Sequence, residues 1–179
     1  AGDRIAIGNL FYTVATVTNN TNLTISETFR GSNVTAYSAF AAITKKNIFV
    51  RDIQLKGSTS VTGNIRSFAV ENLRIEDCFI HTGNIGIQTL YCTNVGINNN
   101  FSFGHENGDG AGIELDYFTS GSVTGNVLAN NNGTFGDGIY IIASQYISVS
   151  GNYLFNNDGY GIRVGSGSIN NILSNNIFY

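Results

Sequence analysis

Two carboxylates, Glu114 and Asp116, lie two residues apart in the run Ile113-Glu114-Leu115-Asp116, where they alternate with apolar side chains. Alternation with a period of two is typical of a β-strand with one buried face, so both carboxylates are predicted on the outward face, about 7 Å apart at Cα. Glycoside hydrolysis needs such a pair, one carboxyl to protonate the leaving oxygen and one to act as base or nucleophile. Glu114 and Asp116 are therefore candidate catalytic residues.

Similar alternating segments follow at 139–142 and 162–164. They are predicted to place Tyr140 one strand away from Glu114 on the same face, and Arg163 two strands away. The Gly-containing segment 103–111, FGHENGDGA, is predicted as a projecting loop, where binding residues concentrate. The candidate site thus comprises three catalytic residues, Glu114, Asp116 and Asp109, and four substrate-binding residues, Tyr140, Arg163, His105 and Glu106.

The residue types leave three interpretations open. In a hydrolase, Tyr140 stacks on a sugar ring and Arg163 holds Asp116 or a substrate carboxylate through two hydrogen bonds. In a lyase or epimerase, the same Tyr or Arg assists proton abstraction next to a uronate. In the third interpretation these are ordinary polar side chains on the solvent face of a strand.

Other chemistries have less support. Asp-Gly pairs recur at 109–110, 137–138 and 158–159, and turns explain them better than calcium ligands. The segment GDGAG lacks the Lys-Ser/Thr of a phosphate-binding loop. Cys78 and Cys92 are predicted as buried free thiols, because two cysteines do not make a disulfide framework. We expect no bound metal and no cofactor.

The strand that carries Glu114 belongs to a unit that recurs along the chain. A branched apolar residue returns every 22 to 26 residues, at Val50, Ile75, Ile97, Val123, Val149 and Leu173. Three positions after each of them stands a residue of a second series: Ile53, Cys78, Asn100, Asn126, Asn152 and Asn176. A fixed period in this range indicates a repeat architecture, and the four Asn predict an inward-facing ladder of side-chain amides.

Short strands separated by Gly and Asn predict stacked β-coils rather than helices. One coil cannot bury its apolar face alone, whereas coils stacked about 4.8 Å apart build a continuous core. We therefore predict an all-β fold, a right-handed parallel β-helix of about six coils over residues 44–179. Residues 1–43 are predicted as a small N-terminal β-hairpin unit. The last coil stops at Tyr179 in mid-coil, so we expect the helix to be truncated there.

The GDGI and GIxI units, with their Asn spacing over residues 46–179, resemble the pectate-lyase-like β-helix superfamily. Polysaccharide lyases, epimerases and phage tailspike depolymerases belong to it. Segment 1–43 loosely resembles small β units ahead of β-helices in phage tail proteins. The resemblance implies a tailspike or tail-fibre segment of a virion, a homotrimer that binds, with or without cleaving, a host cell-surface polysaccharide.

Two alternatives stay open: a secreted, extracellular bacterial lyase or epimerase of the same fold, and a non-catalytic structural or adhesive β-helix. The chain has no Pro, so it lacks the Arg-x-Pro-x-x-Arg element of lyases and the Asp-Pro-His-Asp element of alginate epimerases. This departure puts a named lyase activity in doubt.

Charge is distributed unevenly along the chain. Residues 1–74 have eight Lys and Arg against four Asp and Glu, net +4, whereas residues 75–179 have one Arg against eight Asp and Glu, net −7. The acidic second part argues against a nucleic-acid partner, which needs a basic surface. It also favours a neutral or mixed glycan over a densely anionic one. No apolar run is long enough to predict a membrane span.

Overall fold

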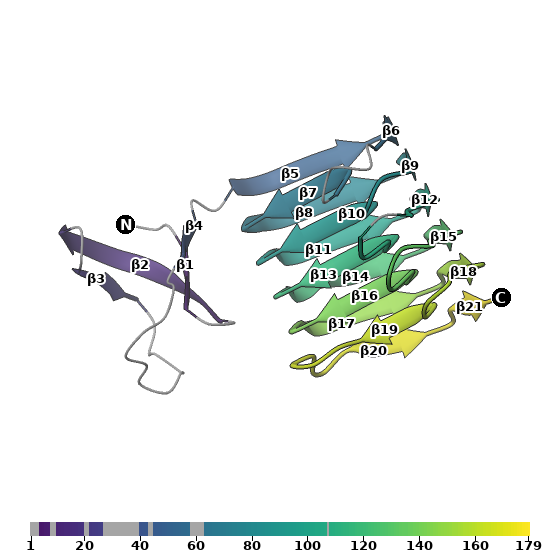
Figure 1. Ribbon diagram of the computed structural model, residues 1–179. Coiled ribbons are helices and arrows are strands. Elements are labelled where there is room, and N and C mark those ends of the chain that lie inside the picture. The colour runs from purple at the N-terminus through teal and green to yellow at the C-terminus, as the bar shows by residue number, and fades with distance from the viewer. Residues whose placement is uncertain are drawn as a thin grey trace. The chain divides into compact units, whose positions relative to one another are not determined.

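The computed structural model describes residues 4–7, 10–19, 22–26, 40–42, 45–57, 63–106 and 108–179. The chain divides into two compact units, Ala1–Lys45 and Lys46–Tyr179. All the regular elements of the described residues are β-strands (Figure 1). None of the described segments is a helix long and apolar enough to cross a membrane.

The first unit is an antiparallel sheet with the strand order β3-β2-β1-β4. Strands β2 and β3 form the predicted hairpin, paired from Asn19 opposite Asn22 to Val14 opposite Ile25. Strand β1 lies between β2 and β4 and pairs with both in antiparallel fashion. The four strands are β1 (Arg4–Ile7), β2 (Leu10–Asn19), β3 (Asn22–Ile25) and β4 (Phe40–Ala42).

The second unit is a parallel β-helix built from three sheets (Figure 1). Sheet I consists of β7 (Ile65–Phe68), β10 (Ile87–Leu90), β13 (Ile113–Asp116), β16 (Ile139–Ile142) and β19 (Ile162–Val164). Sheet II consists of β5 (Lys45–Arg51), β8 (Val70–Glu76), β11 (Thr93–Asn98), β14 (Thr119–Thr124), β17 (Gln145–Ser150) and β20 (Ile172–Ser174). Sheet III consists of β6 (Gln54–Lys56), β9 (Phe79–His81), β12 (Phe101–Phe103), β15 (Val127–Ala129), β18 (Tyr153–Phe155) and β21 (Ile177–Phe178).

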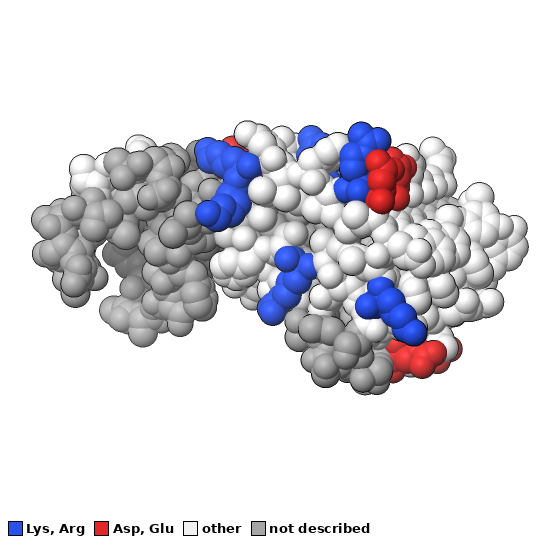
Figure 2. Space-filling model, turned by 90° about the horizontal axis from the view of Figure 1, so that it is seen from above, with Lys and Arg blue, Asp and Glu red and all other residues white. Residues whose placement is uncertain are grey.

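Each coil passes through sheets II, III and I in turn, so strands β5 to β19 make five complete coils and β20 and β21 begin another. The predicted all-β parallel helix is therefore confirmed, with a coil count slightly below the predicted six. Seen from the β5 and β6 end, the described surface carries more Lys and Arg than Asp and Glu (Figure 2). The positive part of the sequence thus includes the first coils of the helix.

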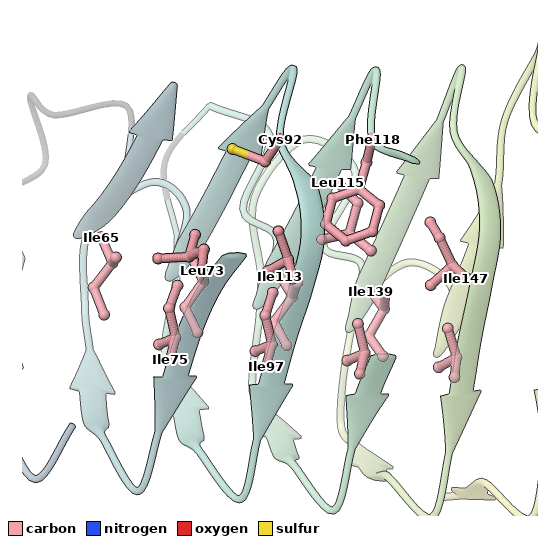
Figure 3. Close-up of a cluster of buried hydrophobic side chains, with 14 of the residues drawn as sticks. Ile65, Leu73, Ile75, Cys92, Ile97, Ile113, Leu115, Phe118, Ile139 and Ile147 are labelled. Atoms are coloured by element: carbon pink, nitrogen blue, oxygen red, sulfur yellow. The ribbon is translucent and has the colours of Figure 1, made fainter. Parts of the chain in front are cut away.

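The core is a set of apolar columns that run along the helix. In sheet II, Ile75, Ile97, Val123 and Val149 lie opposite one another in register, as the period predicted, and are fully buried. Sheet I adds a second column that includes Ile113 and Ile139, and Figure 3 shows these side chains and those of Ile75 and Ile97 pointing into the same interior. Stacking identical or similar side chains gives every coil the same core contacts, which is how a solenoid stabilises units that cannot fold alone.

The turn between sheets II and III explains the polar part of the repeat. It has one residue with positive φ in every coil, an Asp, Asn or Gly, which are the residue types that tolerate this conformation best: Asp52, Asp77, Asn99, Gly125, Gly151 and Asn175. The next residue, in coils that carry Asn there, points inward. Asn126 Nδ2 donates to Asn152 Oδ1 (2.9 Å) and to the Ile97 carbonyl (2.9 Å).

The amide ladder extends in both directions from this pair. Asn100 Nδ2 donates to Asn126 Oδ1 (3.0 Å), and Asn152 Nδ2 donates to Asn176 Oδ1 (2.9 Å). Cys78 continues the column, because its backbone N–H donates to Asn100 Oδ1 (3.0 Å). Ile53, at the same position of the first coil, has no side-chain amide and is partly exposed, with 37% of its surface accessible, so the ladder does not extend into that coil. The ladder supplies partners to polar groups that water cannot reach.

Candidate functional site

The candidate site lies on the outward face of sheet I. Strand pairing in register places Arg66, Gln88, Glu114, Tyr140 and Arg163 in one column across five coils. Phe68, Leu90, Asp116 and Ile142 form the neighbouring column. Ile113 and Leu115, which alternate with the two carboxylates, are fully buried in the core, so the alternation of β13 turns Glu114 and Asp116 to the opposite side.

Glu114 is covered even though it faces outward. Only 7% of its surface is accessible, and Gln88 Nε2 donates a 3.0 Å hydrogen bond to its Oε1. Burial is the main cause that raises the pKa of Glu114 above its ordinary value; the Gln88 hydrogen bond opposes this rise, and the charges of Asp109 and Asp116 add to it. A carboxyl in this setting holds its proton more readily than a solvated one.

Asp116 is half-buried, and burial raises its pKa too. Its Oδ1 atom is enclosed and accepts no hydrogen bond from the described residues. The two carboxyls therefore differ in their hydrogen bonds: Glu114 accepts one from the Gln88 amide, whereas Asp116 has an enclosed oxygen without a hydrogen-bond partner. Glu114 is nevertheless the more deeply covered of the two, and unequal burial of neighbouring carboxyls separates the acid from the base in glycosidases.

Arg163 pairs with Asp137, which the Asp-Gly pattern predicts only as a turn residue. Its Nε lies 2.7 Å from Asp137 Oδ2, and the Tyr160 backbone N–H donates to Asp137 Oδ1 (2.9 Å). Asp137 is almost fully buried, which raises its pKa, while Arg163 acts in the opposite direction. The predicted contact between Arg163 and Asp116 is not observed; the guanidinium instead pairs through Nε with the buried carboxylate of Asp137.

Aromatic rings enclose this ion pair. The Arg163 guanidinium carbon lies 3.8 Å from the ring centroid of Tyr140 and 4.3 Å from that of Phe135. Both distances are within the range of cation–π attraction. The guanidinium thus covers one face of Tyr140, and the cluster attaches the loop before β16 to the strands of sheet I.

Three predicted site residues lie in the loop before β13, and two of them are exposed whereas the third is buried. Glu106 and Asp109 are exposed, and the charge of Asp109 acts on Glu114. His105 is fully buried, so the prediction that its side chain borders the outward face is wrong. Its Nε2 shares a 2.9 Å hydrogen bond with Ser102 Oγ in the interior.

His105 is part of a second inward ladder, at the corner between sheets III and I. Its backbone N–H donates to Asn131 Oδ1 (3.4 Å), and Asn131 Nδ2 donates to Asn157 Oδ1 (2.7 Å), with 26 residues between the members of each pair. The same spacing separates Asn100, Asn126 and Asn152 of the first ladder, so the period was the signal that identifies His105 as an interior residue. Burial lowers the pKa of His105 to about 4.

The remaining polar candidates agree with simpler roles. Cys78 and Cys92 are buried free thiols. Among the described residues there is no group of three His, Cys, Asp or Glu side chains arranged to hold a metal ion.

The parallel coils, the Asn ladder and the outward acidic face define the class of protein. A family model described as "Right handed beta helix region" matches residues 10–178, so the chain belongs to the right-handed β-helix family. No curated protein matches the sequence.

Among solved structures, the fold is similar to that of a putative glycosyl hydrolase from Parabacteroides merdae ATCC 43184. The TM-score is 0.54 at 15% sequence identity, and the match covers 76% of this chain and 77% of that one. At this identity the likeness concerns the fold alone.

Proposed function

We propose that this protein binds a polysaccharide on the outward face of sheet I and hydrolyses it, with Glu114 as the proton donor. The observation that carries the proposal is the enclosure of Glu114 beside a second carboxyl on a rigid face, where its pKa is raised. The likeness of the fold to a putative glycosyl hydrolase agrees with this reaction class.

The proposed reaction assigns one role to each carboxyl. Protonated Glu114 gives its proton to the glycosidic oxygen as the bond between that oxygen and the anomeric carbon breaks. Ionised Asp116 attacks the anomeric carbon directly, or takes a proton from the water that does so. In the first case water then breaks the bond between Asp116 and the sugar and gives a proton to Glu114. In the second, Asp116 releases its proton to solvent and Glu114 takes one up from solvent. In both cases water supplies the hydroxyl of the new sugar end. Asp109, exposed in the adjoining loop, contributes its charge to the raised pKa of Glu114.

The pairing of Arg163 supports a neutral or mixed glycan. A guanidinium that binds a uronate needs accessible donors directed at the ligand. Arg163 instead pairs with Asp137 through Nε, lies between the rings of Tyr140 and Phe135, and has its Nη2 buried. The net charge of the helix body, −7 over residues 75–179, also repels polyanions. Tyr140 and the exposed Glu106 remain the candidate contacts to sugar hydroxyls.

The test is binding and cleavage of a panel of neutral, mixed and anionic polysaccharides by the wild type, Glu114→Gln and Asp116→Asn. We expect both variants to bind and to lose cleavage by roughly 100-fold or more. The matched control is Asp77→Asn, which removes an exposed carboxylate at a turn with φ of 54°, where Asn is well tolerated. Cleavage retained in both site variants would refute the assignment, and binding without any cleavage would favour an adhesive β-helix.

The resemblance to phage tail proteins extends this proposal to a biological setting. In that setting the chain is part of a tailspike or tail fibre on a virion, and the polysaccharide is on the surface of the host cell. The alternative setting is a secreted bacterial enzyme. Virions probed with antibodies to this chain distinguish the two, since only the first predicts labelled tails.

A further inference from the structure

We propose that Gln88 is a positioning residue for Glu114, whose side-chain amide holds the carboxyl in one orientation in both of its protonation states. The contact between the two side chains stands by itself, and only its catalytic consequence rests on the proposed function. Nothing in the family match assigns a role to Gln88.

The contact is built into the sheet. Strands β10 and β13 pair in register with Gln88 opposite Glu114, and the residues are 8% and 7% exposed. Parallel strands hold such partners about 4.8 Å apart. Because both side chains are already restricted by burial, the 3.0 Å hydrogen bond between Gln88 Nε2 and Glu114 Oε1 costs less side-chain freedom than a contact between exposed, mobile side chains.

The other atom of the Gln88 amide suggests the second half of the inference. Oε1 of Gln88 is buried and has no hydrogen-bond donor among the described residues. A buried acceptor without a partner is destabilising. When Glu114 takes up a proton, its O–H is the missing donor, and a half-turn of the amide about its last bond brings Gln88 Oε1 to it.

Gln88 thus gives Glu114 a partner before and after proton transfer. The NH2 group donates to the carboxylate, and the carbonyl accepts from the carboxylic acid. The charged groups that act on Glu114 from the surrounding elements are Asp109 in the loop, Asp116 on β13 and Arg163 on β19. These charges change only the pKa of Glu114, whereas the Gln88 amide also holds its carboxyl in one orientation.

The first test uses the wild-type protein. In two-dimensional NMR spectra recorded from pH 3 to pH 9, the side-chain amide resonances of Gln88 should move with the same midpoint as the carboxyl carbon of Glu114, assigned with Glu114→Gln. A Gln88 amide that does not respond at the Glu114 midpoint would overturn the inference. This measurement needs no substrate, so it is decided even if the protein cleaves no glycan.

The second test replaces the amide by an apolar side chain of similar length, Gln88→Met. The hydrogen bond of the amide to the charged carboxylate is stronger than its bond to the neutral acid, so loss of both should move the titration midpoint of Glu114 upward. If the wild type cleaves a glycan of the panel, kcat should fall about tenfold with little change in KM, and the alkaline limb of the pH profile should move to higher pH.

Gln145→Met provides the control, since Gln145 lies on sheet II and has a similar shape but no contact with Glu114. It should leave both the midpoint and kcat unchanged. An unaltered Glu114 midpoint in Gln88→Met would contradict the inference. Loss of cleavage in Glu114→Gln together with an unmoved Gln88 amide would leave the proposed function standing and remove the role of Gln88 alone.

Discussion

At the residue scale, His105 has the environment that pH should disturb most clearly. It is fully buried, and its pKa falls from the ordinary 6.5 to about 4. In the unfolded chain His105 takes up a proton below pH 6.5, whereas in the folded protein it does so only near pH 4. The free energy of unfolding therefore decreases as the pH falls through this window. The loss attributable to His105 approaches roughly 3 kcal/mol at its lower end.

Urea unfolding of the wild type and of His105→Asn at pH 7 and pH 4.5 tests this expectation. Asn is the residue that the same ladder uses at 131 and 157, so the variant should fold and should lose less stability in acid than the wild type. The comparison between the two proteins is needed because Glu114, Asp116 and Asp137 have raised pKa values and favour the folded state in acid. Equal losses in the two proteins would rule out His105 as the source.

Asn126 is the second residue whose replacement should be costly. Its amide donates to Asn152 and to the Ile97 carbonyl and accepts from Asn100, all in the interior. We expect Asn126→Leu to lower the free energy of unfolding by about 2–4 kcal/mol, because the neighbouring amides lose partners where water cannot replace them. Asn132→Leu, in an exposed loop position, should change it by less than about 0.5 kcal/mol.

At the scale of the element, the ion pair of Arg163 and Asp137 fastens the loop before β16 to sheet I. Removing the guanidinium leaves a carboxylate that is 1% exposed without its counter-charge. Arg163→Gln should therefore lower stability by about 2–4 kcal/mol, somewhat less in acid, where Asp137 can take up a proton. Thermal unfolding at pH 7 and pH 4.5 measures both effects.

Arg66→Gln is the matched control for this prediction. Arg66 lies in the same column of sheet I, at its other end, and is exposed. Its replacement should alter the free energy of unfolding by less than about 0.5 kcal/mol. Similar losses of stability in the two variants would show that the effect comes from removing a positive charge and not from breaking the buried ion pair.

The elements also show which parts of the site could be predicted from the sequence. Alternation with a period of two identifies the outward residues of a strand, which is why the column of Glu114, Tyr140 and Arg163 was predictable. The period of the repeat gave the register between strands, because the same position recurs in each coil. The Asn ladder followed from the same two patterns.

The enclosure of these residues could not be predicted in the same way. Alternation and period give the direction of the Glu114 side chain but not how closely its neighbours pack over it, and Asp137 stands in an Asp-Gly pair that is equally typical of a solvated turn. His105 was assigned to the surface because its neighbours are polar and Gly-rich. Its spacing to Asn131 indicated the interior, but that ladder has only two Asn and a His, so the pattern is weaker than the first one.

At the scale of the whole molecule, the resemblance to tail proteins predicts an assembly of three chains, each of 19.2 kDa. Sheet III carries exposed aromatic rings, Phe79 and Tyr153 at 40% and 38%, which an interface between copies would bury. Sedimentation velocity at micromolar concentration should give three times the mass of one chain. Phe79→Asp combined with Tyr153→Asp should shift the species toward the monomer, and a wild type that sediments as a folded monomer would contradict the prediction.

The regular spacing of the ladders has a consequence for how such a chain can change its length. Asn100, Asn126 and Asn152 are bonded to one another at intervals of 26 residues, and His105, Asn131 and Asn157 keep the same interval. Duplicating the codons of one complete coil, for example codons 113–138, would add one matching residue to every ladder and apolar column and one matching strand to every sheet. Inserting one codon within a strand would instead turn the following side chains of that strand to the other face. An insertion of 26 residues should therefore destabilise the fold less than an insertion of one residue within a strand. We expect homologues to differ in length by complete coils.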